Sequence, residues 1–149
     1  MGGNVSSAQE KLQGHVERAF QIIRLLDKNI ILIFHDDQLK CYGGAKGIRD
    51  EHFLESALAQ PQASFAGEYV HMDVFHMAAA YGFHLCQNYP FCDGNKRTGL
   101  TAMYTFLFVN GYKLIVDKKS LYAIMIDLAS GKITKDELRE FQKSQSISR

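Results

Sequence analysis

Apolar side chains recur every three or four positions through most of this chain, a pattern that predicts a series of short, packed helices. Aspartate or threonine precedes several of these runs, and glycine or proline follows them, as expected where helices begin and end. The predicted helices span residues 8–27, 51–60, 74–87, 95–110, 120–129 and 135–142.

The remaining segments give weaker signals. Residues 30–39 fit a buried helix and a strand equally well, and residues 62–70 lack a clear period, which favours an exposed loop or a short hairpin. One strand candidate stands out, Lys113–Val116. The sequence therefore predicts a mostly α fold, a helical bundle with at most one small β element.

Composition narrows the class of protein. Of the 149 residues, 46% are hydrophobic and 22% are charged, which is typical of one soluble globular domain. A net charge of +1 gives no electrostatic footprint for nucleic acid. No apolar run approaches the ~20 residues that cross a bilayer, and the N-terminus lacks the pattern of a secretory signal. We expect a cytoplasmic protein that forms one domain over residues 1–149, with residues 1–30 as an N-terminal helical extension, and that binds neither membranes nor nucleic acid directly.

Candidate chemistry is concentrated in one segment, Asn88–Gly99, which reads NYPFCDGNKRTG between two apolar helices. A helix N-terminus offers free N–H groups and the positive end of the helix dipole, and a preceding glycine lets a ligand approach. Lys96 and Arg97 place cations where the dipole prefers anions, a conflict that an anionic ligand would remove. Asp93 can offer a hard oxygen ligand to magnesium. From these residues alone, a phosphate site and a capped turn with two solvated basic side chains both remain open.

The same segment closely resembles the Fic/Doc motif, whose pattern is roughly His-Pro-Phe-x-Asp-Gly-Asn-Gly/Lys-Arg. Two further regions are similar to the Doc (death-on-curing) branch: Tyr42–Ala57, which contains YGG, GIRD and LESA, and Ala129–Ile133. The resemblance extends over about residues 31–143. It implies an all-α Fido fold and an enzyme that uses magnesium-bound ATP to modify a hydroxyl group on a target protein.

The resemblance also implies roles for individual residues. By position, Asp93 would bind magnesium, Gly94, Asn95 and Lys96 would form the anion-holding turn, and Arg97 would grip a phosphate. Tyr89 stands where the family has its catalytic histidine. Free histidine titrates near pH ~6.5 and free tyrosine near ~10, so tyrosine is a poor proton acceptor at neutral pH. Because general-base help is typically worth ~10²–10⁴ in rate, we expect this chain to be inactive or attenuated.

The other histidines offer no clear replacement for the missing base. His84 lies within the preceding predicted helix, and His52, His71 and His76 are expected to be interior or surface side chains. Tyr89 is then either an introduced substitution that lets a toxic protein be produced, or the mark of a natural inactive relative. The intact residues around Tyr89 favour the first explanation.

Two positions bear on the transferred group. AMP-transferring Fic proteins have a glycine at the position of Lys96 and a second arginine at that of Leu100, and both departures match the Doc branch, which acts as a protein kinase on a translation factor. We therefore expect phosphoryl transfer, with AMP transfer and a non-catalytic nucleotide- or antitoxin-binding protein as alternatives. Family members are often silenced by a helix bearing [Ser/Thr]-x-x-x-Glu-[Gly/Asn]. The nearest match, Ser6–Lys11, ends in lysine, so an antitoxin chain acting in trans is the expected inhibitor.

Overall fold

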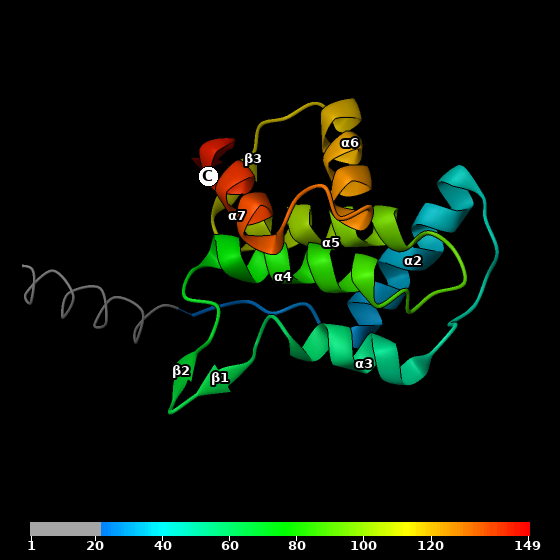
Figure 1. The fold of residues 1–149 in the computed structure, drawn as a ribbon, viewed down its shortest axis with the longest axis horizontal. Coiled ribbons are helices and arrows are strands. Elements are labelled where there is room, and N and C mark those ends of the chain that lie inside the picture. Colours follow the sequence, from blue (N-terminus) through cyan, green and yellow to red (C-terminus); the bar gives the residue numbers. More distant parts are fainter. Residues whose placement is uncertain (1–21) are drawn as a thin grey trace, which may run out of the picture.

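The computed structural model describes residues 22–149, which contain six helices and four short strands (Figure 1). The mostly α fold class is therefore confirmed. No helix within these residues has both the length and the apolar character needed to cross a bilayer. The helices are α2 (Lys28–Tyr42), α3 (Glu51–Ala59), α4 (Val74–Gln87), α5 (Asn95–Val109), α6 (Lys118–Ala129) and α7 (Lys135–Ser144).

Helices α4 and α5 form the centre of the molecule, with α3 on one side of the pair and α6 and α7 on the other (Figure 1). The three consecutive alanines of α4, residues 78–80, are fully buried, as expected for a helix packed on several sides. The two helices approach closely at two glycines, because a Cβ atom on Gly99 would lie 3.1 Å from the carbonyl oxygen of Gly82. This packing fixes the two ends of the α4–α5 connection, which carries the predicted site.

Five of the six described helices begin after a side chain that accepts a hydrogen bond from the backbone N–H three residues further on. These N-cap residues are Asp27, Asp50, Asp73, Asp117 and Thr134. Thr134 also completes the predicted capping box with Glu137. Helix α5 differs, because its N-cap is Gly94 and no side chain bonds its first N–H groups.

The ambiguous stretch over residues 30–39 lies within helix α2. The buried residues of α2 are Ile31, His35 and Leu39, which recur every four positions and so share one face of the helix. Asp27 caps this helix by accepting a hydrogen bond from the N–H of Ile30, at 2.9 Å. This cap was not predicted from the sequence, and it favours a helix over a strand.

The N-terminal prediction differs from the structure where the two can be compared. Most of the predicted helix over residues 8–27 lies outside the described residues, but residues 22–27 are described and are not helical. Their N–H groups bond to other elements instead. Arg24 donates to the side-chain oxygen of Asn110 and Leu26 donates to the hydroxyl of Tyr81, both at 2.9 Å.

Two small antiparallel sheets are present, where the sequence predicts at most one β element. Strands β1 (Ser64–Phe65) and β2 (Glu68–Tyr69) form a hairpin inside the aperiodic stretch over residues 62–70. Strand β3 (Tyr112–Leu114) overlaps the strand candidate and pairs with β4 (Ser146–Ser148). Strand β4 was not predicted because three residues show no period and their partner is distant in the sequence.

Candidate functional site

The connection between α4 and α5 begins at Tyr89, which follows the helix C-cap Asn88. Tyr89 has a φ of 48°, in the left-handed region, and its side chain is 45% exposed. Arg49 holds this backbone, because its Nε donates to the carbonyl of Tyr89 at 2.6 Å and its Nη2 donates to that of Asn88 at 2.9 Å. The predicted catalytic position is therefore exposed and rests on a fixed backbone.

The segment before helix α3 runs alongside this connection. The N–H of Arg49 donates to the carbonyl of Pro90 at 2.7 Å, and the N–H of Cys92 donates to the carbonyl of Gly47 at 3.0 Å. Ile48 and Phe91 form an isolated antiparallel bridge between these bonds. The glycine-rich turn that contributed to the family resemblance is thus packed against the motif itself.

Asp93 is exposed, and both oxygens of its carboxylate accept hydrogen bonds from backbone groups. The donors are the N–H of Ala45 at 3.2 Å and the N–H of Gly94 at 2.9 Å. These bonds, with the nearby cations of Arg97 and Lys96, hold the pKa of Asp93 below its usual value. Asp93 is therefore ionised at neutral pH, as a ligand for a cation must be.

Gly94 ends the connection in the left-handed conformation, with a φ of 78° and a ψ of 16°, which glycine adopts at little cost. Helix α5 starts directly after it and has no acidic residue in its first turn. Lys96 and Arg97 lie in that turn, and neither forms a salt bridge with any residue between 22 and 149. The positive end of α5 thus carries two further cations and no compensating carboxylate on the helix itself.

Asn95 has a structural role in addition to the one predicted for it. Its buried side chain accepts from the N–H of Phe91 and donates to the carbonyl of Phe91, each at 3.0 Å. The side chain therefore closes the turn from inside and is not directed at a ligand. The contribution of Gly94, Asn95 and Lys96 to an anion-holding turn would come from their backbone N–H groups, and it stays a prediction.

Arg97 lies between two aromatic rings. Its guanidinium carbon is 4.5 Å from the ring centre of Tyr42 at the end of α2, and 5.1 Å from that of Tyr122 in α6. All three residues line a cavity of about 360 Å³, which Lys118 and Lys119 also line. The sequence identified the arginine but not the two tyrosines, because they come from helices distant in the chain.

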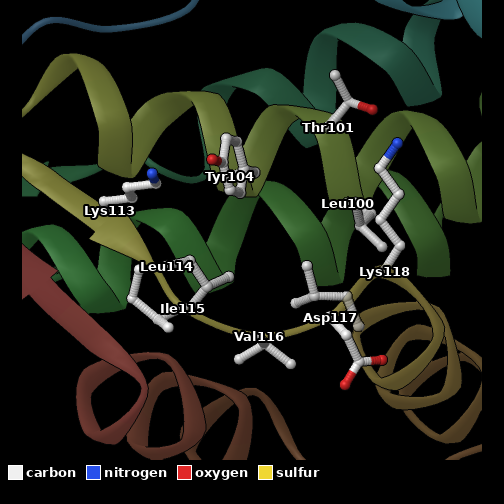
Figure 2. Close-up of a pocket in the computed structure, with 10 residues that line it drawn as sticks. Leu100, Thr101, Tyr104, Lys113, Leu114, Ile115, Val116, Asp117 and Lys118 are labelled. Carbon is white, nitrogen blue, oxygen red and sulfur yellow. The ribbon is translucent and has the colours of Figure 1, made fainter.

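A second cavity, of about 620 Å³, shares Leu100, Thr101 and Lys118 with the first (Figure 2). Figure 2 shows the side chains of α5 on one side of it and those of residues 113–118 on the other. Most of its lining residues are apolar, including Leu114. Its lining also includes three charged residues, Lys113, Asp117 and Lys118, but no residue of the α4–α5 connection.

His84 is engaged away from the connection. Its Nε2 lies 3.3 Å from the ammonium nitrogen of Lys135 in α7, and the Nε2 of His71 lies 3.2 Å from the same nitrogen. Burial and the Lys135 ammonium lower the pKa of His84 to about 4, and the same two causes lower the pKa of His71. The two imidazoles therefore accept hydrogen bonds from Lys135 in their neutral forms, which gives them a structural role.

This arrangement predicts that the fold loses stability in mild acid. The pKa of His84 is about 4 in the folded protein, against 6.5 for an ordinary histidine, so the unfolded chain takes up the proton first as the pH falls. The stabilisation is complete above pH 6.5 and is lost between 6.5 and about 4. We expect His84 to lower the free energy of unfolding by about 2 kcal/mol between pH 7.5 and pH 5, as measured by urea unfolding.

A matched pair of variants isolates this effect. In His84→Gln, the difference in the free energy of unfolding between pH 7.5 and pH 5 should be smaller by about 2 kcal/mol. His52→Gln, at an exposed position of α3, should keep all of it. An unchanged pH dependence in His84→Gln would show that another group causes the acid sensitivity.

Comparison with known proteins agrees with the resemblance found in the sequence. Residues 25–107, which include the whole α4–α5 connection, match the sequence profile of the Fic/DOC family. The chain is similar to Toxin Doc of Mycolicibacterium smegmatis, with 40% identity over 76 residues that make up 51% of this chain and 58% of the relative. It is also similar to Protein kinase doc of Escherichia phage P1, with 30% identity over 112 residues, or 75% of this chain and 87% of the relative.

Proposed function

Because this chain belongs to the Fic/Doc family, we propose that it is the toxin of a toxin–antitoxin pair and transfers a phosphoryl group from ATP to a hydroxyl group of a target protein. One relative is named a toxin and the other a protein kinase. The observation that carries the proposal is the start of α5. It has no side-chain cap, it follows the ionised Asp93, and it bears Lys96 and Arg97 in its first turn.

The residues at this connection fit magnesium-bound ATP. Asp93 supplies carboxylate oxygen, the ligand type that magnesium prefers. Gly44 packs so closely against this group that a Cβ atom on Gly44 would lie 2.8 Å from the Oδ2 of Asp93. The N–H groups at the start of α5 suit phosphate oxygens. When bound, magnesium-bound ATP supplies the phosphoryl group and a metal charge that offsets its negative charge.

The chain's own residues then act by position and charge. Asp93 would hold the metal, while Lys96 and Arg97 would stabilise negative charge on the transferred group. The planar donor fork of Arg97 suits phosphate oxygens. Tyr89 occupies the position from which the family histidine would accept the proton of the attacking hydroxyl, and its exposed side chain can be reached by a target protein.

Tyr89 also favours a second candidate function. If tyrosine at this position accepts no proton, the chain is a pseudoenzyme that binds nucleotide or an antitoxin without transferring a group. Restoring histidine separates the two functions, because only an otherwise complete enzyme gains activity from that change.

The proposed partners follow from the toxin function. They are an antitoxin chain acting in trans, and a target protein, for which a translation factor is the first candidate. The nearest match to the family's inhibitory motif, Ser6–Lys11, lies outside the described residues. We propose that the protein acts in the cytoplasm, where ATP, magnesium and translation factors are present.

We expect the chain to bind magnesium-bound ATP even with Tyr89, because the groups proposed to contact phosphate lie on the other side of the connection. Titration calorimetry with ATP and magnesium should show binding that Arg97→Ala removes. In Asp93→Asn, the binding of ATP should no longer depend on magnesium.

Lys132→Ala is the matched control for the loss of one positive charge, since this lysine side chain is 74% exposed and lies after α6. It should bind as the unchanged protein does. Equal affinity in Arg97→Ala would place the nucleotide away from the start of α5 and remove the support for the proposed function.

A further inference from the structure

His35 contacts the motif from a helix 58 residues away in the sequence. It lies in the buried face of α2 and is only 6% exposed. The sequence alone did not single out His35, and a histidine on the buried face of a helix is usually part of the core. The structure shows that its ring contacts three residues of the α4–α5 connection, Phe91, Asp93 and Gly94.

The first contact is a hydrogen bond with a defined direction. The Nε2 of His35 lies 2.8 Å from the carbonyl oxygen of Asp93. A carbonyl oxygen only accepts, so Nε2 carries the proton and donates it. This bond orients the peptide group that joins Asp93 to Gly94.

The second and third contacts are made by the flat faces and the edge of the ring. The imidazole stacks on Phe91 with the ring centres 3.8 Å apart and the planes 8° from parallel. Its Cδ2 would lie 3.6 Å from a Cβ atom at Gly94, so the ring also packs beside the residue that starts α5. One side chain thus bounds the connection at Phe91, Asp93 and Gly94.

The orientation of the Asp93–Gly94 peptide matters to both halves of the proposed site. On one side it carries the Asp93 side chain, whose carboxylate also accepts from the N–H of Ala45. On the other side it leads through the left-handed Gly94 into the uncapped N–H groups of α5. A rotation of this peptide would move the proposed metal ligand relative to the proposed phosphate donors.

We propose that His35 is a positioning residue, whose Nε2–H fixes the Asp93–Gly94 peptide so that the Asp93 carboxylate and the first N–H groups of α5 face one magnesium-bound nucleotide together. This inference rests on the proposed function. It assigns the role to the hydrogen bond and not to the bulk of the ring, which a purely packing residue would also supply.

Two substitutions separate the hydrogen bond from the bulk. His35→Phe keeps a ring that can stack on Phe91 but loses the donor, whereas His35→Gln keeps an amide N–H with the reach of Nε2. Groups that orient a metal ligand typically affect affinity or activity by 10–100-fold. We expect His35→Phe to raise the Kd for magnesium-bound ATP by roughly that factor, and His35→Gln to recover most of the loss. His52→Phe, on the exposed face of α3, should bind as the unchanged protein does.

Amide hydrogen exchange without nucleotide gives a readout that is independent of function. The N–H of Gly94, which donates to the Asp93 side chain, should exchange at least about tenfold faster in His35→Phe and near the original rate in His35→Gln. Unchanged affinity and exchange in a folded His35→Phe would overturn the proposal. If the unchanged protein binds no nucleotide, the proposed function fails, and the exchange rates still decide whether His35 orients the connection.

The unchanged protein provides a test that needs no variant. A long-range ¹H–¹⁵N spectrum distinguishes the two tautomers of neutral imidazole, and His35 should carry its proton on Nε2. A proton on Nδ1 alone would leave Nε2 unable to donate to Asp93, and the proposal would be wrong even if His35→Phe failed to fold.

Discussion

Replacing Tyr89 with histidine is expected to raise the rate of protein modification by about 10²–10⁴-fold, the usual contribution of a general base. The expectation rests on the residues around Tyr89, which have the features that the proposed reaction would require. Asp93 is ionised, α5 begins without a side-chain cap, and Arg97 lies beside the cavity next to that helix. Under the proposed function, a proton acceptor at position 89 is the component that this chain lacks.

The structure also indicates that the substitution leaves the fold intact. Tyr89 has a left-handed backbone, with a φ of 48°, a region in which histidine is found more often than most residues. Its backbone is held by Arg49 through carbonyl oxygens, which any residue supplies. A change in activity therefore reports on the side chain and not on a rearranged backbone.

Expression in cells without an antitoxin measures the effect. Tyr89→His should arrest growth at a level of protein that the unchanged chain allows, and it should modify a protein in a cell lysate supplied with ATP. Tyr69→His is a matched control, because Tyr69 in β2 is 41% exposed, close to the 45% of Tyr89. A Tyr89→His protein that neither slows growth nor modifies any protein would remove the main support for the toxin function.

Local signals in the sequence predicted most of the helices. Aspartates at positions 50 and 73 bond the N–H three residues on, and such a cap depends on neighbouring residues only. Helix α4 accordingly has the predicted bounds, Val74–Gln87. The failures occur where distant segments compete for the same groups. Residues 22–27 are not helical, and within them Arg24 donates its N–H to Asn110 and Leu26 donates its N–H to Tyr81.

The site shows the same division between local and distant information. A sequence motif identifies Asp93, Gly94, Lys96 and Arg97, because these residues lie close together in the chain. The side chains that contact this segment come from distant parts of the chain. His35 and Tyr42 come from α2 and Tyr122 from α6, and Arg49, from the segment before α3, bonds the backbone at Tyr89. Only the packing of these elements around α5 shows that they meet at one place.

The transferred group is expected to be the γ-phosphoryl group of ATP, and the two departures from the AMP-transferring pattern give the reason. Lys96 places a long cationic side chain in the first turn of α5, where those relatives have glycine and therefore more room for phosphates. Leu100 lines the same cavity as Arg97, so an apolar side chain stands where those relatives have a second arginine. Both changes disfavour a nucleotide pose that exposes the α-phosphorus.

The Tyr89→His protein supplied with ATP labelled at either phosphorus decides between the two reactions. Label from the γ position should enter the target protein, and label from the α position should not, since a kinase releases the α-phosphorus with ADP. The unchanged chain with Tyr89 is the control, and it should incorporate little of either label. The opposite result, α label together with a mass gain equal to AMP, would show that this chain transfers AMP despite Lys96 and Leu100. In that case Lys96→Gly should change the rate of transfer and leave the product the same, because the nucleotide pose would not depend on the lysine.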